Sequence, residues 1–563
     1  MAKVQLRSNF EYGTSRWAVR RAQWRALGLT NEDMLKPKIA VVNTSSELSS
    51  CFSHLDEVSR VVKRSILEAG GYPFEIRTAA PSDFITSAGR RGGYILPTRD
   101  LIVNDIEVAV EGAQLDGMLF LGSCDKTSPG QLMAAARLDL PSIMVICGYQ
   151  KSGSWRGRHM DIEEVFLHAG HVAAGKVTPA ELEEMSDNAV LGPGVCAGMG
   201  TANSMHIVCE ALGMTLPGSA PVAAMSERMF ANARASGRRI VEMVGEDLRP
   251  RSILTPAAFA NASACVLAVS GSINCIKHLQ AIACEAESPT DVYAIFESLS
   301  ARIPVLAAVR PNGEDLIEDF DAAGGTQALL QQLRPLLQDA PTVSGPSMLA
   351  QLDPAVVRNP EVIRPLERPF SAQPAIVIIK GNLAAEGAIV KMGLTHDKVT
   401  RFRGPARIYH SREDALAGLA RGEIRRGNVV VMRCMGVRGG PGMSMASALV
   451  FALDGAGMGE DVAVITDGQL SGLVNRGLVV GEITPETLAG GPLWAARDGD
   501  IIAIDVPGRS ITLDVDEAEI ARRLAGEPAP RPGAATGWLS IYQRTVQPLA
   551  RGASLIPIRE ELP

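Results

Sequence analysis

The chain has 563 residues, of which 55 are Lys or Arg and 62 are Asp or Glu, so its formal net charge is -7. Hydrophobic residues make up 46% and charged residues 21%, the ordinary mix of a globular protein. A chain of this length is too long for one compact core, and we expect two or more domains. Basic and acidic residues are mixed along the chain, which argues against a nucleic-acid partner.

The N-terminal stretch MAKVQLRSNFEYGTSRWAVRRAQWRALG lacks the apolar centre of a secretory signal. No apolar window approaches the roughly 20 residues that a membrane-spanning helix needs. We therefore expect a cytoplasmic protein with no membrane partner. The nine cysteines include no CxxC pair. In a reducing compartment this pattern favours free thiols or scattered metal ligands over disulfides.

The first part of the chain alternates strand patterns with helix patterns. Buried strands are predicted for three short apolar runs, at 38–44, 116–123 and 141–148. Helical periodicity occurs at 55–71 and 128–140. Such alternation predicts a largely parallel sheet covered by helices, with a crevice at the carboxyl ends of the strands.

Cysteines occur in two kinds of sequence context. Most, such as Cys147 and Cys209, lie within apolar patterns and are expected to fill the core. Cys51, Cys124 and Cys196 instead lie in the turn-rich segments SSCFSHL, GSCDKTSPG and GPGVCAGMGTANS. Loops that follow apolar runs are where a fold presents ligands to a cleft, so these three are candidate site residues.

Two further motifs have simpler interpretations. GHVAAGKV, residues 170–177, has the spacing of a phosphate-binding loop, but Val177 stands where a magnesium-binding Ser or Thr is required. A nucleotide hydrolase would rest on this motif alone, and a helix continuing from IEEVFLHAG explains it better. His168 and His171 could be a metal pair, yet three-residue spacing on a helix also makes them simple surface neighbours.

The sequence changes character near Arg334. Residues 334–374 are rich in proline and weakly periodic, as is typical of a connection between domains. Short strands separated by glycine turns follow, at 375–382, 427–436, 461–468, 500–506 and 510–515. They predict a smaller, strand-rich, barrel-like domain. The predicted fold class is therefore α/β, with a parallel-sheet domain at 1–365 and a β-barrel-like domain at 366–563.

Long motifs resemble those of the dihydroxy-acid dehydratase and phosphogluconate dehydratase family, which also includes sugar-acid dehydratases. They appear in the family's order over nearly the whole chain: RALGLTNEDMLKPKIAVVNTSSELSSC, SDFITSAGRRGGYILPTRDLI, CDKTSPGQLMAAARLDLPSI, GPGVCAGMGTANSMHIVCEALGMTLPGSAP, GSINCIKHLQAIA, KGNLAAEGAIVK, GGPGM and TDGQLSG.

The resemblance implies two cofactors. The cysteines matching Cys51, Cys124 and Cys196 hold an iron-sulfur cluster in the family, usually 2Fe-2S, although three cysteines also suit a 4Fe-4S cluster. Three thiolates leave one iron with an open position that can accept a hydroxyl. The family's divalent metal, usually magnesium, is bound by the residues matching Asp83, Asp125 and a carbamylated lysine, Lys126. Carbamylation gives the lysine an oxygen ligand, which a hard ion prefers.

The implied activity is that of a hydro-lyase, which removes water from a 2,3-dihydroxy carboxylic acid to give a 2-keto acid. Ser471 matches the family's general base, and Lys126 belongs to the catalytic set. The main expectation is a dihydroxy-acid dehydratase of the branched-chain amino-acid biosynthesis type. The partner is then a small hydroxy acid, and the family also implies a homodimer or homotetramer.

Several positions depart from the family pattern. Met435 replaces a glutamate that binds magnesium in most dihydroxy-acid dehydratases. Gln469 and Leu470 stand where Arg-Phe is usual, and Glu482 stands where histidine is usual. These changes remove a fixed positive charge and add a negative one near the substrate. Two alternatives therefore stay open: a dehydratase of a sugar acid or specialised-pathway acid, and a catalytically retired homologue with a binding role.

Overall fold

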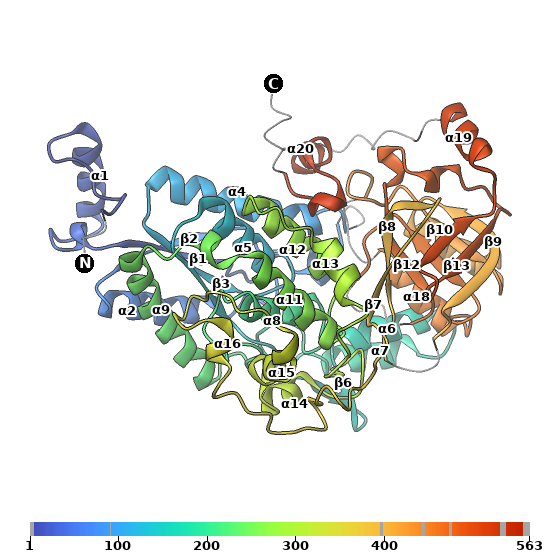
Figure 1. The fold of residues 1–563 in the computed structure, drawn as a ribbon, viewed down its shortest axis with the longest axis horizontal. Coiled ribbons are helices and arrows are strands. Elements are labelled where there is room, and N and C mark those ends of the chain that lie inside the picture. The colour runs from blue at the N-terminus through green and yellow to red at the C-terminus, as the bar shows by residue number, and fades with distance from the viewer. Residues whose placement is uncertain are drawn as a thin grey trace.

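The computed structural model describes residues 5–89, 92–394, 398–440, 445–471, 476–527, 529 and 536–555. It has an α/β region at the N-terminal side and a strand-rich region at the C-terminal side (Figure 1). Among the described residues, no helix is long and apolar enough to cross a membrane.

The N-terminal region is built on a four-stranded parallel sheet in the order β2-β1-β3-β4. Its strands are β1 (Lys38–Asn43), β2 (Tyr72–Arg77), β3 (Gly117–Gly122) and β4 (Ser142–Ile146). Three of them were predicted from apolar runs, and all residues of these three are buried. The sequence analysis missed β2, because it is an edge strand, only partly buried and interrupted by Pro73 and Glu75.

Helices cover this sheet and extend its core. α2 (Leu55–Glu68) buries Leu55, Val58, Val62 and Ile66, one stripe at helical spacing. Other helices of this region are α4 (Ile95–Ala113), α5 (Thr127–Leu138), α8 (Thr201–Ala211), α9 (Glu227–Glu246), α11 (Pro256–Ala268), α12 (Asn274–Glu285), α13 (Val292–Leu299) and α15 (Gly325–Leu333).

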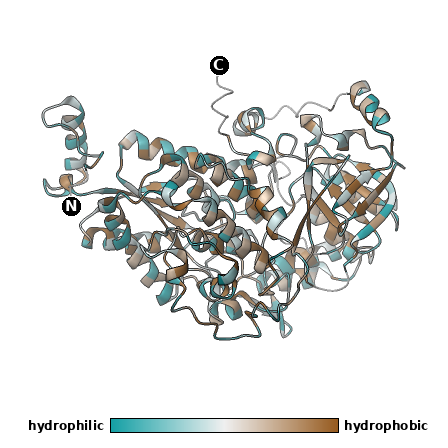
Figure 2. Cartoon of the chain, in the orientation of Figure 1, coloured by the Kyte–Doolittle hydropathy of each residue, from teal (hydrophilic) through white to brown (hydrophobic). Residues whose placement is uncertain are grey.

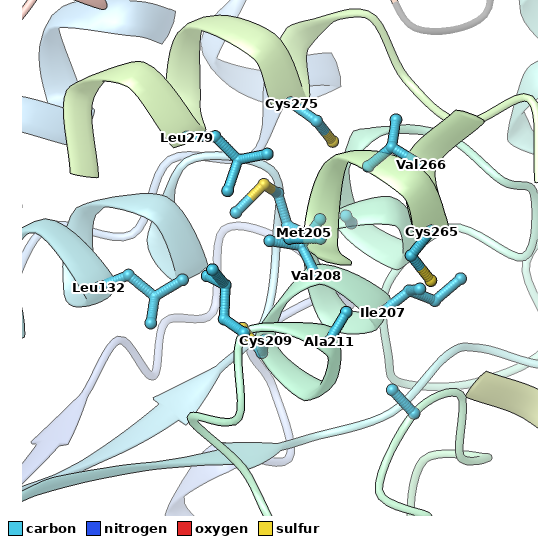
Figure 3. Packing of buried hydrophobic residues seen from close by; sticks show 14 of the residues in the cluster. Leu132, Met205, Ile207, Val208, Cys209, Ala211, Cys265, Val266, Cys275 and Leu279 are labelled. Atoms are coloured by element: carbon cyan, nitrogen blue, oxygen red, sulfur yellow. The ribbon is translucent and has the colours of Figure 1, made fainter. Parts of the chain in front are cut away.

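The central helices α5, α8, α11 and α12 are buried almost on every side. Figure 3 shows Met205 and Val208 of α8 lying among side chains of the neighbouring helices, including Leu279. Cys209 and Cys265 are fully buried in this cluster, so the prediction of core cysteines is confirmed for them. Their pKa values are raised by burial, which keeps both thiols neutral.

Smaller elements complete the N-terminal region and the connection. They are α1 (Ser15–Ala26), α3 (Asp83–Thr86), α6 (Ile162–His171), α7 (Pro179–Asp187), α10 (Pro250–Ile253), α14 (Ile317–Ala322), the hairpin β5 (Gly153–Trp155) and β6 (Arg158–Met160), and α16 (Met348–Gln351). α1 projects from the body near the N-terminus and buries none of its residues (Figure 1). Between α16 and residue 375 the chain is irregular, as its proline content predicts.

The C-terminal region is a closed eight-stranded barrel in the order β10-β11-β12-β8-β7-β14-β13-β9. Its strands are β7 (Ile376–Gly381), β8 (Ala384–Lys391), β9 (Arg401–Tyr409), β10 (Val429–Met432), β11 (Ala463–Thr466), β12 (Val479–Thr484), β13 (Ile501–Asp505) and β14 (Ser510–Leu513). The predicted barrel-like region is confirmed. The helices beside it are α17 (Arg412–Ala420), α18 (Met445–Gly455), α19 (Glu517–Gly526) and α20 (Trp538–Thr545).

Barrel strands alternate between two cores. Val429 and Val431 of β10 point into the barrel, where they join its interior cluster. Val430 and Met432 belong instead to the large cluster that continues from the N-terminal sheet. This alternation is the period of two that a strand imposes on its side chains. The outer face of β10 therefore belongs to an apolar cluster that takes in residues of α17 and α18 and reaches the N-terminal sheet, and Figure 2 shows apolar residues in both regions.

Candidate active site

Five of the candidate residues lie at one edge of the N-terminal sheet. Cys51 follows β1, Asp83 follows β2, and the run from Cys124 to Lys126 follows β3 directly. Because the strands are parallel, their carboxyl ends meet at the same edge, as predicted. The Ser123 hydroxyl donates to the carbonyl of Cys51 at 2.7 Å, which joins two of these loops.

A fourth loop brings Cys196 to the same place. The Gly194 N–H donates to the Ser50 carbonyl at 3.2 Å, so the Cys196 loop lies against the Cys51 loop. The Asn203 amide on α8 donates to the carbonyls of Cys196 and Gly198, both at 2.8 Å. These bonds hold the backbone on both sides of the Cys196 thiol.

The three thiols form one group, in which Cys51 and Cys124 are buried and Cys196 is partly buried. The Cys51 side chain interacts with both Cys124 and Cys196. Contact with Cys124 alone would lower the pKa of Cys51, but Cys196 and burial raise it to about 12. Contact with Cys51, followed by burial, also raises the pKa of Cys124. Three such thiols keep their protons until something with a large positive charge binds them.

Asp83, Asp125 and Lys126 form a second polar group beside the thiols. The Lys126 ammonium is fully buried and lies 3.2 Å from Asp83 Oδ2 and 3.6 Å from Asp125 Oδ2. Burial raises the pKa of Asp83, with Asp125 adding to the effect. Burial alone would lower the pKa of Lys126, but the two aspartates raise it above its usual value. The other oxygen of Asp83 is buried without a hydrogen-bond partner.

In the part of the chain that the structure describes, no group of three or more His, Cys, Asp or Glu side chains is arranged around a single metal ion. The carboxylate group near Lys126 has only two such residues, and its third member is a lysine. The sequence analysis expected this lysine to become an oxygen ligand by carbamylation. That expectation stays a prediction.

The barrel contributes residues at the carboxyl ends of its own parallel strands. β9, β10, β11 and β12 run parallel, so the segments after β10 and β11 lie at one edge. Asp467, fully buried, organises this edge by accepting the backbone N–H groups of Met435 at 2.9 Å, Cys434 at 3.2 Å and Thr487 at 2.9 Å. Ser471 is half-buried on the same loop as Asp467.

The departures from the family pattern gather at this barrel edge. Met435 is 8% exposed and its backbone is held by Asp467. Gln469 and Leu470 are buried in the loop before Ser471, and Glu482 lies within β12. The Glu482 N–H donates to the Gly468 carbonyl at 3.0 Å, which ties β12 to the Ser471 loop.

A buried ion pair that the sequence analysis did not identify joins the two regions. Lys277 of α12 pairs with Glu482 of β12, and both side chains are almost wholly buried. The Lys277 ammonium also donates to Asn274 Oδ1 at 2.6 Å. Burial lowers the pKa of Lys277, and the charges of Lys126 and Arg99 lower it further despite Glu482. The pair therefore lies within electrostatic reach of Lys126.

The GHVAAGKV motif and the pair of His168 and His171 have structural roles. α6 ends at His171, and residues 172–177 form turns, so the expected helical continuation through the GHVAAGKV motif is wrong beyond its first two residues. His171 Nε2 lies 2.9 Å from Asp454 Oδ2, and His168 Nδ1 lies 2.7 Å from the Glu164 carbonyl. Each histidine thus has its own protein partner.

Comparison with known proteins identifies the family. The family model described as dihydroxy-acid/6-phosphogluconate dehydratase N-terminal matches residues 36–351, and its C-terminal counterpart matches residues 361–553. The chain belongs to the dihydroxy-acid/6-phosphogluconate dehydratase family. The resemblance seen in its motifs is thereby confirmed.

Curated members of this family match almost end to end. A dihydroxy-acid dehydratase of Methanococcoides burtonii is 40% identical over 553 residues, which cover 97% of this chain and 99% of the relative. A dihydroxy-acid dehydratase of Caldicellulosiruptor saccharolyticus is 40% identical over 541 residues, covering 96% and 98%. A third, of Moorella thermoacetica, is also 40% identical with the same coverage.

Proposed function

We propose that this chain is a hydro-lyase that removes water from a 2,3-dihydroxy carboxylic acid to give a 2-keto acid, in the manner of a dihydroxy-acid dehydratase. Relatives with that name match nearly the full length of the chain. The observation that carries the proposal is the gathering of two buried cysteines and the partly buried Cys196 beside Asp83, Asp125 and Lys126 at one sheet edge.

The donor sets fit the two cofactors that the family implies. Cys51, Cys124 and Cys196 would hold an iron-sulfur cluster of the 2Fe-2S type, because three converging thiols are a soft ligand set. Asp83, Asp125 and carbamylated Lys126 would hold Mg²⁺. One buried oxygen of Asp83 has no hydrogen-bond partner, and an oxygen is the ligand that a hard ion prefers. When bound, these groups would supply Lewis acidity at the leaving hydroxyl and at the substrate's carboxylate end.

The chain's own residues would perform the proton transfer and the orientation. Ser471 Oγ would take the proton from C2, and the enol left after loss of water becomes the 2-keto acid. A serine acts as a base only where a nearby cation lowers its pKa. Lys126 would belong to the same catalytic set through its carbamate oxygens, and Asp467 would position the Ser471 loop without touching the substrate.

The localisation, the oligomeric state and the partner of this protein are further proposals, which rest on its membership of the family. We place the chain in the cytoplasm as a homodimer or homotetramer, with a small hydroxy acid as its partner and no nucleic acid. Size-exclusion chromatography with light scattering measures the assembly directly, and a monomer at working concentration would contradict it.

The test is turnover of anaerobically purified, cluster-reconstituted protein with Mg²⁺ on a panel of 2,3-dihydroxy acids, following 2-keto acid formation. Cys124→Ser should lower the iron and sulfide content. It should also lower the rate by more than the roughly 100-fold that is lost when a residue supporting a metal ligand is removed, because Cys124 is itself a ligand. Cys284→Ser is the matched control, because Cys284 is a half-buried thiol outside the three-cysteine group. No keto acid from any member of the panel, at full iron and sulfide content, would contradict the proposal.

A further inference from the structure

The helix that begins at Asp83 is too short to hold its own position. α3 has four residues, and its N-cap residue, Ser82, makes no side-chain cap bond. Helices shorter than roughly 12–15 residues are marginal in water, because the first turn fixes many dihedral angles for few hydrogen bonds. Contacts with other elements must therefore fix α3, and with it the Asp83 carboxylate.

Three phenylalanine rings connect α3 to the barrel side. The ring of Phe84 on α3 lies edge-on to that of Phe166 on α6, with the ring centroids 5.9 Å apart. Phe166 in turn lies edge-on to Phe451 on α18, with the centroids 5.1 Å apart. The interplanar angles are 81° and 84°, the T-shaped arrangement that the charge distribution of aromatic rings favours. We call these three residues the aromatic ladder.

The two helices at the barrel end of the ladder approach each other closely, and Figure 1 shows them side by side. Gly170 of α6 lies against Phe451, where an added Cβ would be 2.7 Å from the Cβ of the phenylalanine. At Gly455 of α18, an added Cβ would be 2.9 Å from the Gly170 carbonyl oxygen. His171 Nε2 and Asp454 Oδ2 lie 2.9 Å apart at the same contact. α6 is therefore fixed against α18 by backbone, ring and polar contacts.

α6 also contacts the loop that carries Cys196. Glu163 of α6 is 8% exposed, and its carboxyl group lies against Gly198 of that loop. An added Cβ at Gly198 would be 2.4 Å from Glu163 Oε1, so the position has room only for glycine. One helix thus contacts the Asp83 helix, the Cys196 loop and the barrel side.

We propose that the aromatic ladder positions Asp83 for Mg²⁺, so that the affinity of the metal site depends on Phe166 and Phe451, which lie on helices without any proposed ligand. A carboxylate already held in its binding geometry loses less conformational freedom when an ion binds. Mg²⁺ also demands near-octahedral geometry, which makes its affinity sensitive to small displacements of a ligand. The inference rests on the metal site of the proposed function and adds positioning residues that do not touch the substrate.

The test measures the Mg²⁺ affinity of the full-length, cluster-loaded protein by calorimetry, with bicarbonate present so that Lys126 can be carbamylated. Phe166→Leu keeps an apolar side chain on α6 but removes the central ring of the ladder. It should raise the Kd for Mg²⁺ about three- to tenfold, the range that one aromatic pair contributes. Phe451→Leu should raise it less, because the pair of Phe84 and Phe166 remains. Iron and sulfide content should stay unchanged in both variants.

Hydrogen exchange tests the position of α3 directly, before Mg²⁺ is added. Amide protection over residues 82–89 should fall in Phe166→Leu, because the short helix loses its supporting contact. A double variant separates the pair from other effects of the two rings. Phe84→Leu/Phe166→Leu should weaken Mg²⁺ binding no more than the larger of the single changes, since both break the same contact.

Phe370→Leu is the matched control. Phe370 is a half-buried phenylalanine whose ring packs under the Arg364 guanidinium, in the connection between the two regions. Its replacement should change neither the Kd for Mg²⁺ nor the exchange of α3. Thermal unfolding checks folding, and if Phe166→Leu folds poorly, Phe451→Leu decides the test.

The outcomes separate this inference from the proposed function, because neither measurement depends on turnover. No Mg²⁺ binding by wild type, a Kd that Phe166→Leu leaves unchanged, or a raised Kd without a change in the exchange of α3 overturns the role of the ladder. Keto acid formation by wild type would still support the dehydratase in the last two cases. The expected shifts in Kd and exchange, without keto acid from any substrate, support the ladder and overturn the dehydratase.

Discussion

The two regions of the molecule use the same structural device for different chemistry. Each gathers its polar residues at the carboxyl ends of parallel strands. The N-terminal sheet presents cysteines, aspartates and a lysine, which are ligand types for clusters and metals. The barrel presents Ser471, which we propose as the base, and Asp467, which holds the backbone of Cys434, Met435 and Thr487. Met435, Gln469, Leu470 and Glu482, which depart from the family pattern, lie on the barrel side.

Replacing Ser471 should produce the largest effect that separates the two regions. Ser471→Ala should lower kcat roughly 10²–10⁴-fold, the usual contribution of a general base. Iron, sulfide and Tm should stay unchanged, because the cluster ligands belong to the other region. Keto acid formation and metal analysis measure both effects, with Ser510→Ala on β14 as the control. Normal turnover by Ser471→Ala would show that the base lies elsewhere.

Breaking the Lys277–Glu482 pair tests how firmly the regions are joined. Lys277→Met leaves the Glu482 carboxylate buried and alone, and should cost about 3–5 kcal/mol of the free energy of unfolding. The double variant Lys277→Met/Glu482→Met should recover most of that loss in urea unfolding.

The matched control for this pair is an exposed one. Lys380 lies 3.0 Å from Glu297 with half of its side chain exposed, so Lys380→Met should cost less than about 1 kcal/mol. Equal costs for the buried and the exposed pair would contradict the role given to Lys277 and Glu482.

A buried carboxylate makes the stability of the N-terminal region depend on pH. Burial raises the pKa of Glu210 to about 7, although it accepts N–H groups of Gly218 and Ala220. Between its unfolded pKa of about 4.3 and about 7, the folded chain holds a proton that the unfolded chain has lost. The contribution of Glu210 to the free energy of unfolding is therefore present at low pH and is lost as the pH rises to about 7.

Glu210→Gln removes this dependence. Relative to wild type, the variant should gain stability from pH 5 to pH 8 by about 3 kcal/mol, measured by urea unfolding at each pH. Parallel curves for the two proteins would mean that Glu210 ionises equally in the folded and unfolded chains.

The smallest expected effects come from two helix caps, one in each region. The Thr255 side chain accepts the Ala258 N–H at the start of α11, and the Ser411 side chain accepts the Asp414 N–H at the start of α17. Thr255→Ala and Ser411→Ala should each cost about 1 kcal/mol. If the regions unfold together, both changes shift one calorimetric transition. Two transitions that respond separately would show independent unfolding.

Strands that read as short apolar runs could be predicted from the sequence, including β13 and β14 with only alternate positions buried, whereas strands interrupted by charged residues or glycine could not. β1, β3, β4 and β10 read as apolar runs because no face meets water. β9 has charged residues on its exposed positions, and β12 contains Gly481 and Glu482, so neither gives such a run. The division at residues 365 and 366 stays a prediction.

The site was only partly predictable for a similar reason. Cys51 and Cys124 follow strands that the sequence predicts, so local pattern places them at a sheet edge, but Asp83 follows β2, which the sequence analysis missed. The roles of all three came from family resemblance. Lys277 gave no signal, because a lysine on a helix normally faces solvent. Only the fold shows that α12 is buried on nearly every side and that its charge partner comes from the barrel.

The alternation of β10 between two cores limits how this protein can be divided. Val430 and Met432 belong to the apolar cluster that joins α17 and α18 to the N-terminal region, so a fragment cut from that region would expose part of an apolar surface that the intact chain covers. Exchange of one half between relatives would need compensating changes in the other. The two halves should therefore be inherited and recombined as a unit, even though family models recognise them separately.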